Sequence, residues 1–319
     1  MSARNLGLIF VAVLALAAIA CGGGDGGTAA AVLSCQEEPA STVADASAFP
    51  IEIQDDAGQT VRLAAPPQAI ASLSAGHTEM LYALGAGDQV AAVDNFSDCP
   101  EVTDDLPHVD SFSPSVEAIV ALEPDLVILS FDPGGLREAL SGLDIPVLFL
   151  SFPASVQEVF GQIELLGRVT GHEDEAKAVV EGMSDGMDEI IGKLADLDQG
   201  PTVFHELSTD LWTVGPGSFV HDLYTLLKAR NIAEASGVSA SQLNTEALIE
   251  ADPEVIILAD EDAGASADSV AARPGWSNIA AVQNGRIYLV DPNIVSRPGP
   301  RLVEALATLA RLLYPERFE

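Results

Sequence analysis

The sequence predicts an α/β protein of two lobes, each built on a mostly parallel sheet, with one long helix joining them. Three observations support this prediction. Short apolar runs alternate with helical patterns in both halves of the chain, an extended helical pattern separates the halves, and one helix–strand unit occurs twice. The 319 residues are enough for two domains, and a hydrophobic content of 48% is typical of a globular protein with a substantial core.

Residues 1–20 have the pattern of a lipoprotein signal peptide. Arg4 precedes an apolar run over Leu6–Ala20, which is shorter than the about 20 apolar residues needed to span a bilayer. Small residues before Cys21 resemble a lipobox, so Cys21 is predicted to be the lipidated mature N-terminus; the alternative is ordinary signal cleavage beside an incidental cysteine. Residues 21–48, rich in Gly, Ala, Ser and Thr, are predicted to be a flexible tether.

The first lobe is expected over residues 49–171. It opens with a predicted hairpin over residues 51–63, after which strand and helix patterns alternate. This alternation predicts a parallel sheet with helices on both faces. The expected strands are Ala69–Leu73, Gln89–Val93, Asp125–Ser130 and Val147–Ser151, and the expected helices are His77–Leu84, Val116–Leu122 and Leu136–Leu143.

The bridging helix is expected over residues 172–199. Apolar residues recur at helical spacing from Ala176 to Leu197, with acidic residues between them. A helix of this pattern would be roughly 38 Å long. Its three interior glycines each disfavour the helix by up to about 1 kcal/mol, so packing along the apolar stripe must hold it.

The second lobe is expected over residues 200–319. Its predicted strands are Thr202–Glu206, Val255–Ala259 and Ile287–Val290, and its predicted helices are Phe219–Leu227, Thr245–Ala251 and Pro300–Leu313. Residues 117–129 align without a gap on residues 246–258, and each copy reads as a short helix, an acid–proline turn and a buried strand. Such units are common, but the gapless match favours two related lobes.

Composition and motifs exclude several functions. The chain has 14 Lys and Arg against 48 Asp and Glu, a net charge of −34, which repels nucleic acid and anionic lipids. Neither is an expected partner, and membrane contact is expected through the lipid anchor only. No GxSxG, HExxH or P-loop motif is present, so an enzyme is not expected.

The sequence does not determine whether Cys35 and Cys99 form a disulfide.

Five segments resemble motifs of the Fe/B12-type periplasmic solute-binding proteins of ABC importers, in the same order. They extend over residues 72–85, 94–100, 123–128, 213–219 and 296–301. The resemblance covers the chain from about residue 50 to its end. It implies two Rossmann-like lobes with mostly parallel sheets bridged by one long helix, and a ligand between the lobes. It also implies an extracytoplasmic, lipid-anchored protein, expected as a monomer, that docks on a permease driven by an ATPase.

Candidate ligand-binding residues follow the predicted strands, because parallel α/β lobes bind ligands beyond the carboxyl ends of their strands. A neutral imidazole can ligate a metal or form a hydrogen bond, aromatic rings suit a large planar ligand, and arginine suits an anionic ligand group. Each candidate also has a structural interpretation, such as helix capping for His77 or a salt bridge between Arg297 and Asp291. The candidates are His77, Phe96, Phe112, Phe131, His205, Trp212, Asp291 and Arg297.

The expected ligand is a metal chelate, either cobalamin or a ferric siderophore, and no resident cofactor is expected. Two alternatives stay open: haem with His77 as axial ligand, and a bare Zn²⁺ or Mn²⁺ ion held by His77, His205 and Asp291.

Glu117 and Glu246 are the predicted permease contacts. They open the two copies of the repeat, after the plausible N-caps Ser115 and Asn244. The resemblance implies arginines at the matching points of the permease. The alternative is a favourable interaction of each carboxylate with its own helix dipole.

Overall fold

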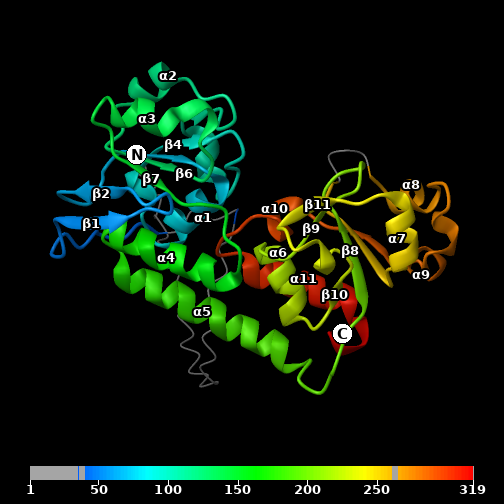
Figure 1. Ribbon diagram of the computed structural model, residues 1–319. Helices are drawn as coiled ribbons and strands as arrows, with labels where there is room; N and C mark the ends of the chain where they lie inside the picture. Colours follow the sequence, from blue (N-terminus) through cyan, green and yellow to red (C-terminus); the bar gives the residue numbers. More distant parts are fainter. Residues whose placement is uncertain (1–34, 36–39, 261–264, 319) are drawn as a thin grey trace, which may run out of the picture.

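The computed structural model describes residues 35, 40–260 and 265–318 as two lobes lying side by side (Figure 1). Cys21, the predicted lipidation site, and the predicted signal peptide lie outside the described residues. In the described part of the chain, no helix combines the length and the apolar character that crossing a bilayer requires.

Lobe one contains a five-stranded parallel sheet in the order β5-β4-β3-β6-β7. The chain starts at the central strand β3, winds outward through β4 and β5, and then crosses to β6 on the other side of β3. The winding direction therefore reverses between β3 and β6, where α/β sheets open a crevice for ligands. The strands are β3 (Ile70–Leu73), β4 (Val90–Asp94), β5 (His108–Val109), β6 (Leu126–Leu129) and β7 (Val147–Phe149).

Helices cover both faces of this sheet, as predicted. Leu126 and Ile128 of β6 pack in the same apolar cluster as residues of α1 and α4, whereas Val127 and Leu129 pack with α2 and α3. Because both faces are buried, the strand is a continuous apolar run instead of an alternating one. The helices are α1 (Ala75–Ala83), α2 (Val116–Val120), α3 (Leu136–Ser141) and α4 (Val156–Thr170), with short 3₁₀ helices at η1 (Gly87–Gln89), η2 (Glu101–Asp105) and η3 (Pro133–Gly135). The predicted hairpin is β1 (Ile51–Gln54) with β2 (Thr60–Leu63), paired antiparallel.

The bridging helix α5 (Glu173–Gly192) runs along both lobes but is shorter than the predicted segment 172–199 (Figure 1). Beyond Gly192 the backbone N–H groups bond to carbonyls three residues earlier, so the chain continues as turns. Leu194 is fully buried in one of these turns, which is why the apolar spacing continued past the end of the helix. The sequence interpretation did not include α4, which precedes α5 and packs against it.

Lobe two contains a mixed but mostly parallel sheet. Its order is β11-β9-β8-β12-β13, with β10 also paired to β8, and only β9 runs antiparallel to its neighbours. The strands are β8 (Thr202–Glu206), β9 (Trp212–Val214), β10 (Arg230–Asn231), β11 (Ala240–Gln242), β12 (Val255–Leu258) and β13 (Ile287–Leu289). The helices are α6 (Phe219–Leu226), α7 (Thr245–Ala251), α8 (Ala267–Ala271), α9 (Ala280–Gln283), α10 (Pro292–Val295) and α11 (Leu302–Leu313), with 3₁₀ helices at η4 (Glu234–Ser236), η6 (Trp276–Asn278) and η7 (Pro315–Arg317).

The sequence repeat forms the same structural unit in both lobes. Glu123 and Asp252 occupy equivalent positions before proline, and both have left-handed backbones, with φ of 51° and 45°. Two residues further on, Asp125 accepts backbone hydrogen bonds from the entry to β3, and Glu254 accepts one from Thr202 at the start of β8. Each acid thereby ties the turn to the neighbouring strand.

The chain joins lobe one earlier than the predicted tether boundary at residue 48. Cys35 forms a disulfide with Cys99. The backbone N–H groups of Thr42 and Asp45 donate to the carbonyls of the glycines that follow α1 and α4. The predicted tether 21–48 therefore extends too far, because a composition rich in small residues does not reveal these tertiary contacts.

Candidate functional site

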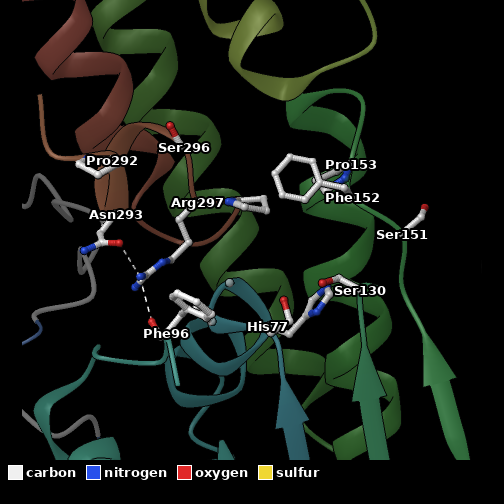
Figure 2. Close-up of a pocket in the computed structure, with 14 residues that line it drawn as sticks. His77, Phe96, Ser130, Ser151, Phe152, Pro153, Pro292, Asn293, Ser296 and Arg297 are labelled. Atoms are coloured by element: carbon white, nitrogen blue, oxygen red, sulfur yellow. Dashed lines mark hydrogen bonds between the residues drawn. The ribbon is translucent and has the colours of Figure 1, made fainter. Parts of the chain in front are cut away.

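A cavity of about 300 Å³ lies beyond the carboxyl ends of β3, β6 and β7. Lobe one contributes residues 74–77, Phe96, Ser130 and residues 151–153 to its walls. The segment 292–298, which contains α10 and follows the last strand of lobe two, forms the rest (Figure 2). The cavity is therefore at the winding reversal of the lobe-one sheet, where ligand binding was predicted.

Gly76 allows the two lobes to meet at this cavity. A Cβ atom at this position would lie 2.3 Å from the carbonyl oxygen of Pro298. Only glycine therefore permits the first turn of α1 to approach the backbone of the lobe-two segment this closely.

Three phenylalanines that follow β4, β5 and β6 form an exposed cluster, here called the phenylalanine cluster: Phe96, Phe112 and Phe131. The ring centroids of Phe96 and Phe112 are 5.4 Å apart, and those of Phe112 and Phe131 are 6.2 Å apart. Their exposed fractions are 51%, 64% and 57%, although phenylalanine is usually buried. Contiguous exposed aromatic surface beside a cavity is typical of a binding site for an apolar partner or ligand.

His77 lies in the cavity wall as a buried, uncharged imidazole. Its Nε2 is 3.2 Å from Oε1 of Gln162, and the amide nitrogen of Gln162 donates to the Ser151 carbonyl at 2.7 Å. The amide oxygen therefore faces His77, which must carry its hydrogen on Nε2, while the buried Nδ1 has no hydrogen-bond partner among the residues that the structure describes. Burial lowers the pKa of His77 to about 4, against the opposing effects of Gln162 and of the Asp56 carboxylate.

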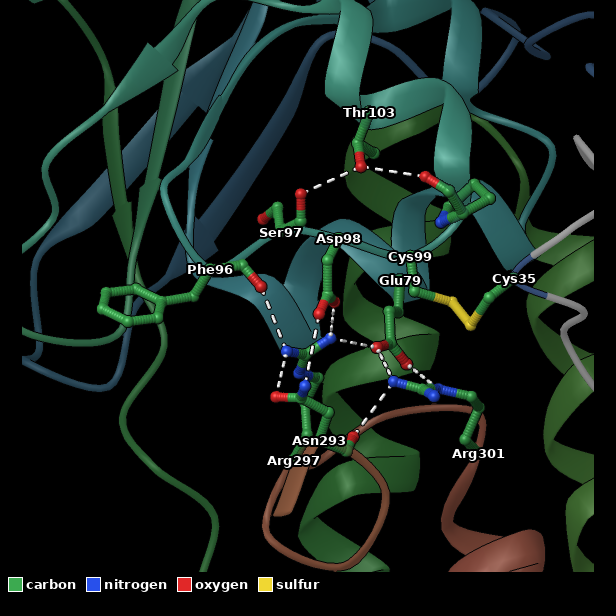
Figure 3. The surroundings of a disulfide bond; sticks show 11 residues. Cys35, Glu79, Phe96, Ser97, Asp98, Cys99, Thr103, Asn293, Arg297 and Arg301 are labelled. Carbon is green, nitrogen blue, oxygen red and sulfur yellow. Dashed lines mark hydrogen bonds and ion pairs between the residues drawn. A yellow bond between two sulfur atoms is a disulfide. The ribbon is translucent and has the colours of Figure 1, made fainter. Parts of the chain in front are cut away.

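Arg297 lines the cavity but is held by residues of the protein. Its two terminal nitrogens donate to Glu79 at 2.8 Å, Asp98 at 2.5 Å, the Phe96 carbonyl at 3.0 Å and the Asn293 side chain at 2.8 Å (Figure 3). Burial opposes the charge of Arg297, but the carboxylates of Asp98 and Glu79 raise its pKa.

Arg301 completes this group from the start of α11. It donates to both oxygens of Glu79, at 3.0 and 2.6 Å. The alternative interpretation of Arg297, a salt bridge to Asp291, is wrong in its partner, because Arg297 pairs with Glu79 and Asp98. Asp291 is the exposed N-cap of α10, where its carboxylate accepts from the Asn293 backbone N–H.

Of the eight candidate residues, His77, Phe96 and Arg297 line this cavity, and five do not: Phe112, Phe131, His205, Trp212 and Asp291. His205 is fully buried within β8, where its Nδ1 is 2.7 Å from the Tyr224 hydroxyl, and burial lowers its pKa to about 4. Trp212 is 42% exposed at the start of β9. Across residues 35, 40–260 and 265–318, no group of three or more His, Cys, Asp and Glu side chains is arranged to hold a metal ion, so the metal set of His77, His205 and Asp291 is not assembled.

Sequence reasoning missed several residues of the cavity wall. Phe152, which is 58% exposed, lies three residues after the end of β7, so the rule that placed Phe131 after β6 would have found it. Asn293 and Ser296 belong to the short helix α10 and the turn after it. Ser296 opens the segment 296–301 that resembles a family motif, but only Arg297 of that segment was chosen as a candidate.

Glu117 and Glu246 occupy matching exposed positions in the first turns of α2 and α7. Ser115 and Asn244 are the N-caps, as predicted, and accept from the backbone N–H groups three residues later. The backbone of Glu117 and the Ser115 hydroxyl lower the pKa of the Glu117 carboxyl.

Comparison with known proteins finds a matching family and relatives that cover most of this chain. The family described as "Periplasmic binding protein" matches residues 70–294. A Bacillus subtilis (strain 168) protein named an uncharacterized ABC transporter substrate-binding lipoprotein, YvrC, is 33% identical over 280 residues, covering 85% of this chain and 88% of the relative. A Halobacterium salinarum (strain ATCC 29341 / DSM 671 / R1) protein named a cobalamin-binding protein is 29% identical over 294 residues, covering 87% and 78%.

A solved structure from Staphylococcus epidermidis ATCC 12228 has the same architecture. It is described as a possible iron-binding (periplasmic solute-binding) protein. Its TM-score is 0.69 at 28% identity, over 78% of this chain and 99% of its own.

Proposed function

Because this chain belongs to the periplasmic binding protein family, we propose that it is the extracytoplasmic substrate-binding lipoprotein of an ABC importer. In this proposal it captures a metal chelate, cobalamin or a ferric siderophore, and delivers it unchanged to the permease. The observation that carries the proposal is the phenylalanine cluster beside the cavity, since three exposed, contacting rings suit a large and partly apolar ligand.

The dimensions of the site favour a ligand that is only partly enclosed. The cavity of about 300 Å³ is at the lower end of the range for enclosed small-molecule sites. A macrocyclic chelate would therefore place one edge in the cavity and extend over the phenylalanine cluster. The name of the Halobacterium salinarum relative supports the same ligand class.

Anchoring and docking complete the proposal. Cys21 would carry the lipid that holds the monomeric protein at the membrane. Glu117 and Glu246 would each enter a basic pocket of the permease, one from each lobe, because they occupy the same place in the two copies of the repeat.

Calorimetric titration of the full chain, purified in a mild detergent, tests the ligand class. We expect cyanocobalamin or a ferric siderophore to bind at one site with a Kd of about 1 μM or lower, and haemin, Zn²⁺ and Mn²⁺ to bind more weakly. Phe112→Ala should weaken chelate binding about tenfold, because it removes the most exposed ring of the cluster.

Leu143→Ala is the matched control, since Leu143 is 53% exposed in lobe one and lies outside the cavity lining. Its affinity should equal that of the unmodified protein. Tight binding of Zn²⁺ or Mn²⁺ with no response to any chelate would contradict the proposal.

A further inference from the structure

Two basic residues line the cavity, His77 and Arg297, so they decide whether the site can attract an anion. A site for a carboxylate or catecholate normally offers a free cation or a free pair of guanidinium N–H groups. The hydrogen bonds that each residue already forms with the protein determine what it offers to a ligand.

Arg297 offers few hydrogen-bond donors to a ligand. A guanidinium has five N–H donors, and four hydrogen bonds to the protein engage its two terminal nitrogens, which leaves the Nε hydrogen. A ligand therefore cannot form a bidentate pair with Arg297. Its charge is also neutralised locally, because Arg297 pairs with both Asp98 and Glu79, and Glu79 pairs in addition with Arg301 (Figure 3).

His77 offers an acceptor and no charge. Gln162 holds the hydrogen on Nε2, and burial keeps the ring neutral at physiological pH. A ligand group that reaches Nδ1 must therefore donate a hydrogen bond, which an amide or hydroxyl can do and a carboxylate cannot.

Two further local charges act on the cavity with opposite sign. The first turn of α1 lines the cavity, and a helix N-terminus is equivalent to about half a positive charge. Against it, the carboxylate of Asp56 accepts two hydrogen bonds, at 2.7 and 2.8 Å, from the cavity residue Ser151. The net charge of −34 over the whole chain adds a further barrier to anions.

We infer that this site selects neutral or cationic chelates that carry amide or hydroxyl groups, and that it discriminates against chelates with a net negative charge. The inference rests on the proposed function and narrows it. It favours corrinoids and ferric hydroxamates over ferric catecholates, ferric carboxylates and haem with its two propionates. It also reverses the expectation that Arg297 pairs with an anionic ligand group.

Matched ligand pairs test this inference. One pair is cyanocobalamin and its monocarboxylic acid derivative, in which one peripheral amide is replaced by a carboxylate; the other is a neutral ferric hydroxamate and a ferric catecholate. Within whichever pair binds, we expect the neutral member to bind about tenfold more tightly than the anionic member at low salt, or better. The difference in affinity should be smaller at high salt. Equal or tighter binding of the anionic member overturns the inference alone. Absence of binding by every chelate overturns the proposed function, and the inference with it.

A variant that removes one of the carboxylates paired with Arg297 tests whether this pairing causes the discrimination against anionic chelates. Asp98→Asn removes a carboxylate whose side chain is 53% exposed, so the fold should be retained, which a melting curve checks. The ratio of affinities for anionic and neutral ligands should rise about two- to fivefold. Glu181→Gln, an equal charge change at an exposed position of α5, should leave the ratio unchanged. An unchanged ratio in Asp98→Asn would contradict the assigned role of Arg297.

Discussion

Two buried histidines, His77 and His205, occupy different positions relative to the strands. His77 lies beyond β3 in the cavity wall, whereas His205 lies inside β8 and bonds to Tyr224. Burial lowers the pKa of both side chains from 6.5 to about 4. Between these pH values the unfolded chain binds more protons than the folded one, so each histidine makes the protein less stable as the pH falls through this window.

Replacing the more deeply buried histidine should flatten this dependence. Between pH 7 and pH 4.5, the free energy of unfolding of the unmodified protein should fall about 2 to 3 kcal/mol more than that of His205→Gln. Denaturant titrations at several pH values provide the measurement. Asp260, whose pKa burial raises to about 6, acts in the opposite direction but is present in both proteins and cancels in the difference. The exposed His108→Gln serves as control, and an equal pH dependence in His205→Gln would show that His205 is not the cause.

At the scale of elements, α4 and α5 form the antiparallel pair that supports the lobes. The helix α4 begins at the N-cap Ser155 and ends at Gly171, which has a left-handed backbone with φ of 80°. Two interior glycines differ in their surroundings. A Cβ at Gly161 would meet no atom within 4 Å, whereas one at Gly167 would lie 2.5 Å from the Cβ of Ala176 in α5.

These two glycines should therefore respond oppositely to the same substitution. Gly161→Ala should stabilise the protein by about 0.5–1 kcal/mol, because alanine loses less backbone entropy in a helix. Gly167→Ala should destabilise it by about 1–3 kcal/mol, because the added methyl group forces the two helices apart. Chemical denaturation measures both changes, and a stabilising effect of Gly167→Ala would mean that α4 and α5 are not packed as closely as described.

At the scale of the whole molecule, the lobes are joined at several places. These include α5, the ion cluster in which Glu79 of lobe one pairs with Arg297 and Arg301 of the C-terminal segment, and the hydrogen bond from the Val156 backbone N–H to the Asp222 carboxylate. Glu79 is 1% exposed, so this cluster is shielded from solvent at the boundary between the lobes. The two acids Glu117 and Glu246 are thereby held at a defined separation, as a two-fold partner would require.

The double variant Glu117→Arg with Glu246→Arg should weaken complex formation with the permease by about 30-fold or more and abolish uptake, because each charge would then face a permease arginine. Ligand affinity and folding should change little. Pull-down with the reconstituted permease and uptake of radiolabelled ligand provide the measurements. Glu138→Arg with Glu250→Arg, exposed acids of α3 and α7, is the control pair. Uptake at the unmodified rate in the first double variant would mean that the two acids serve only their own helices.

The sequence by itself determined the features that depend on residues close together along the chain. The alternation of apolar runs predicted both sheets, the N-caps Ser115 and Asn244 were recognisable, and the repeat predicted the shared helix–turn–strand unit. The strand-end rule also placed His77 and the phenylalanine cluster beyond the carboxyl edge of lobe one. These features follow from periodicity, capping and chain direction, which act over a few residues.

Only the tertiary structure decided which side chains meet. Glu79 and Arg297 are 218 positions apart, and no local pattern distinguishes this pairing from the alternative one with Asp291. The same applies to the disulfide between Cys35 and Cys99 and to the burial of His205. The charge that a ligand encounters depends on these long-range contacts, because an arginine is available to an anion only when no carboxylate of the folded protein already binds it.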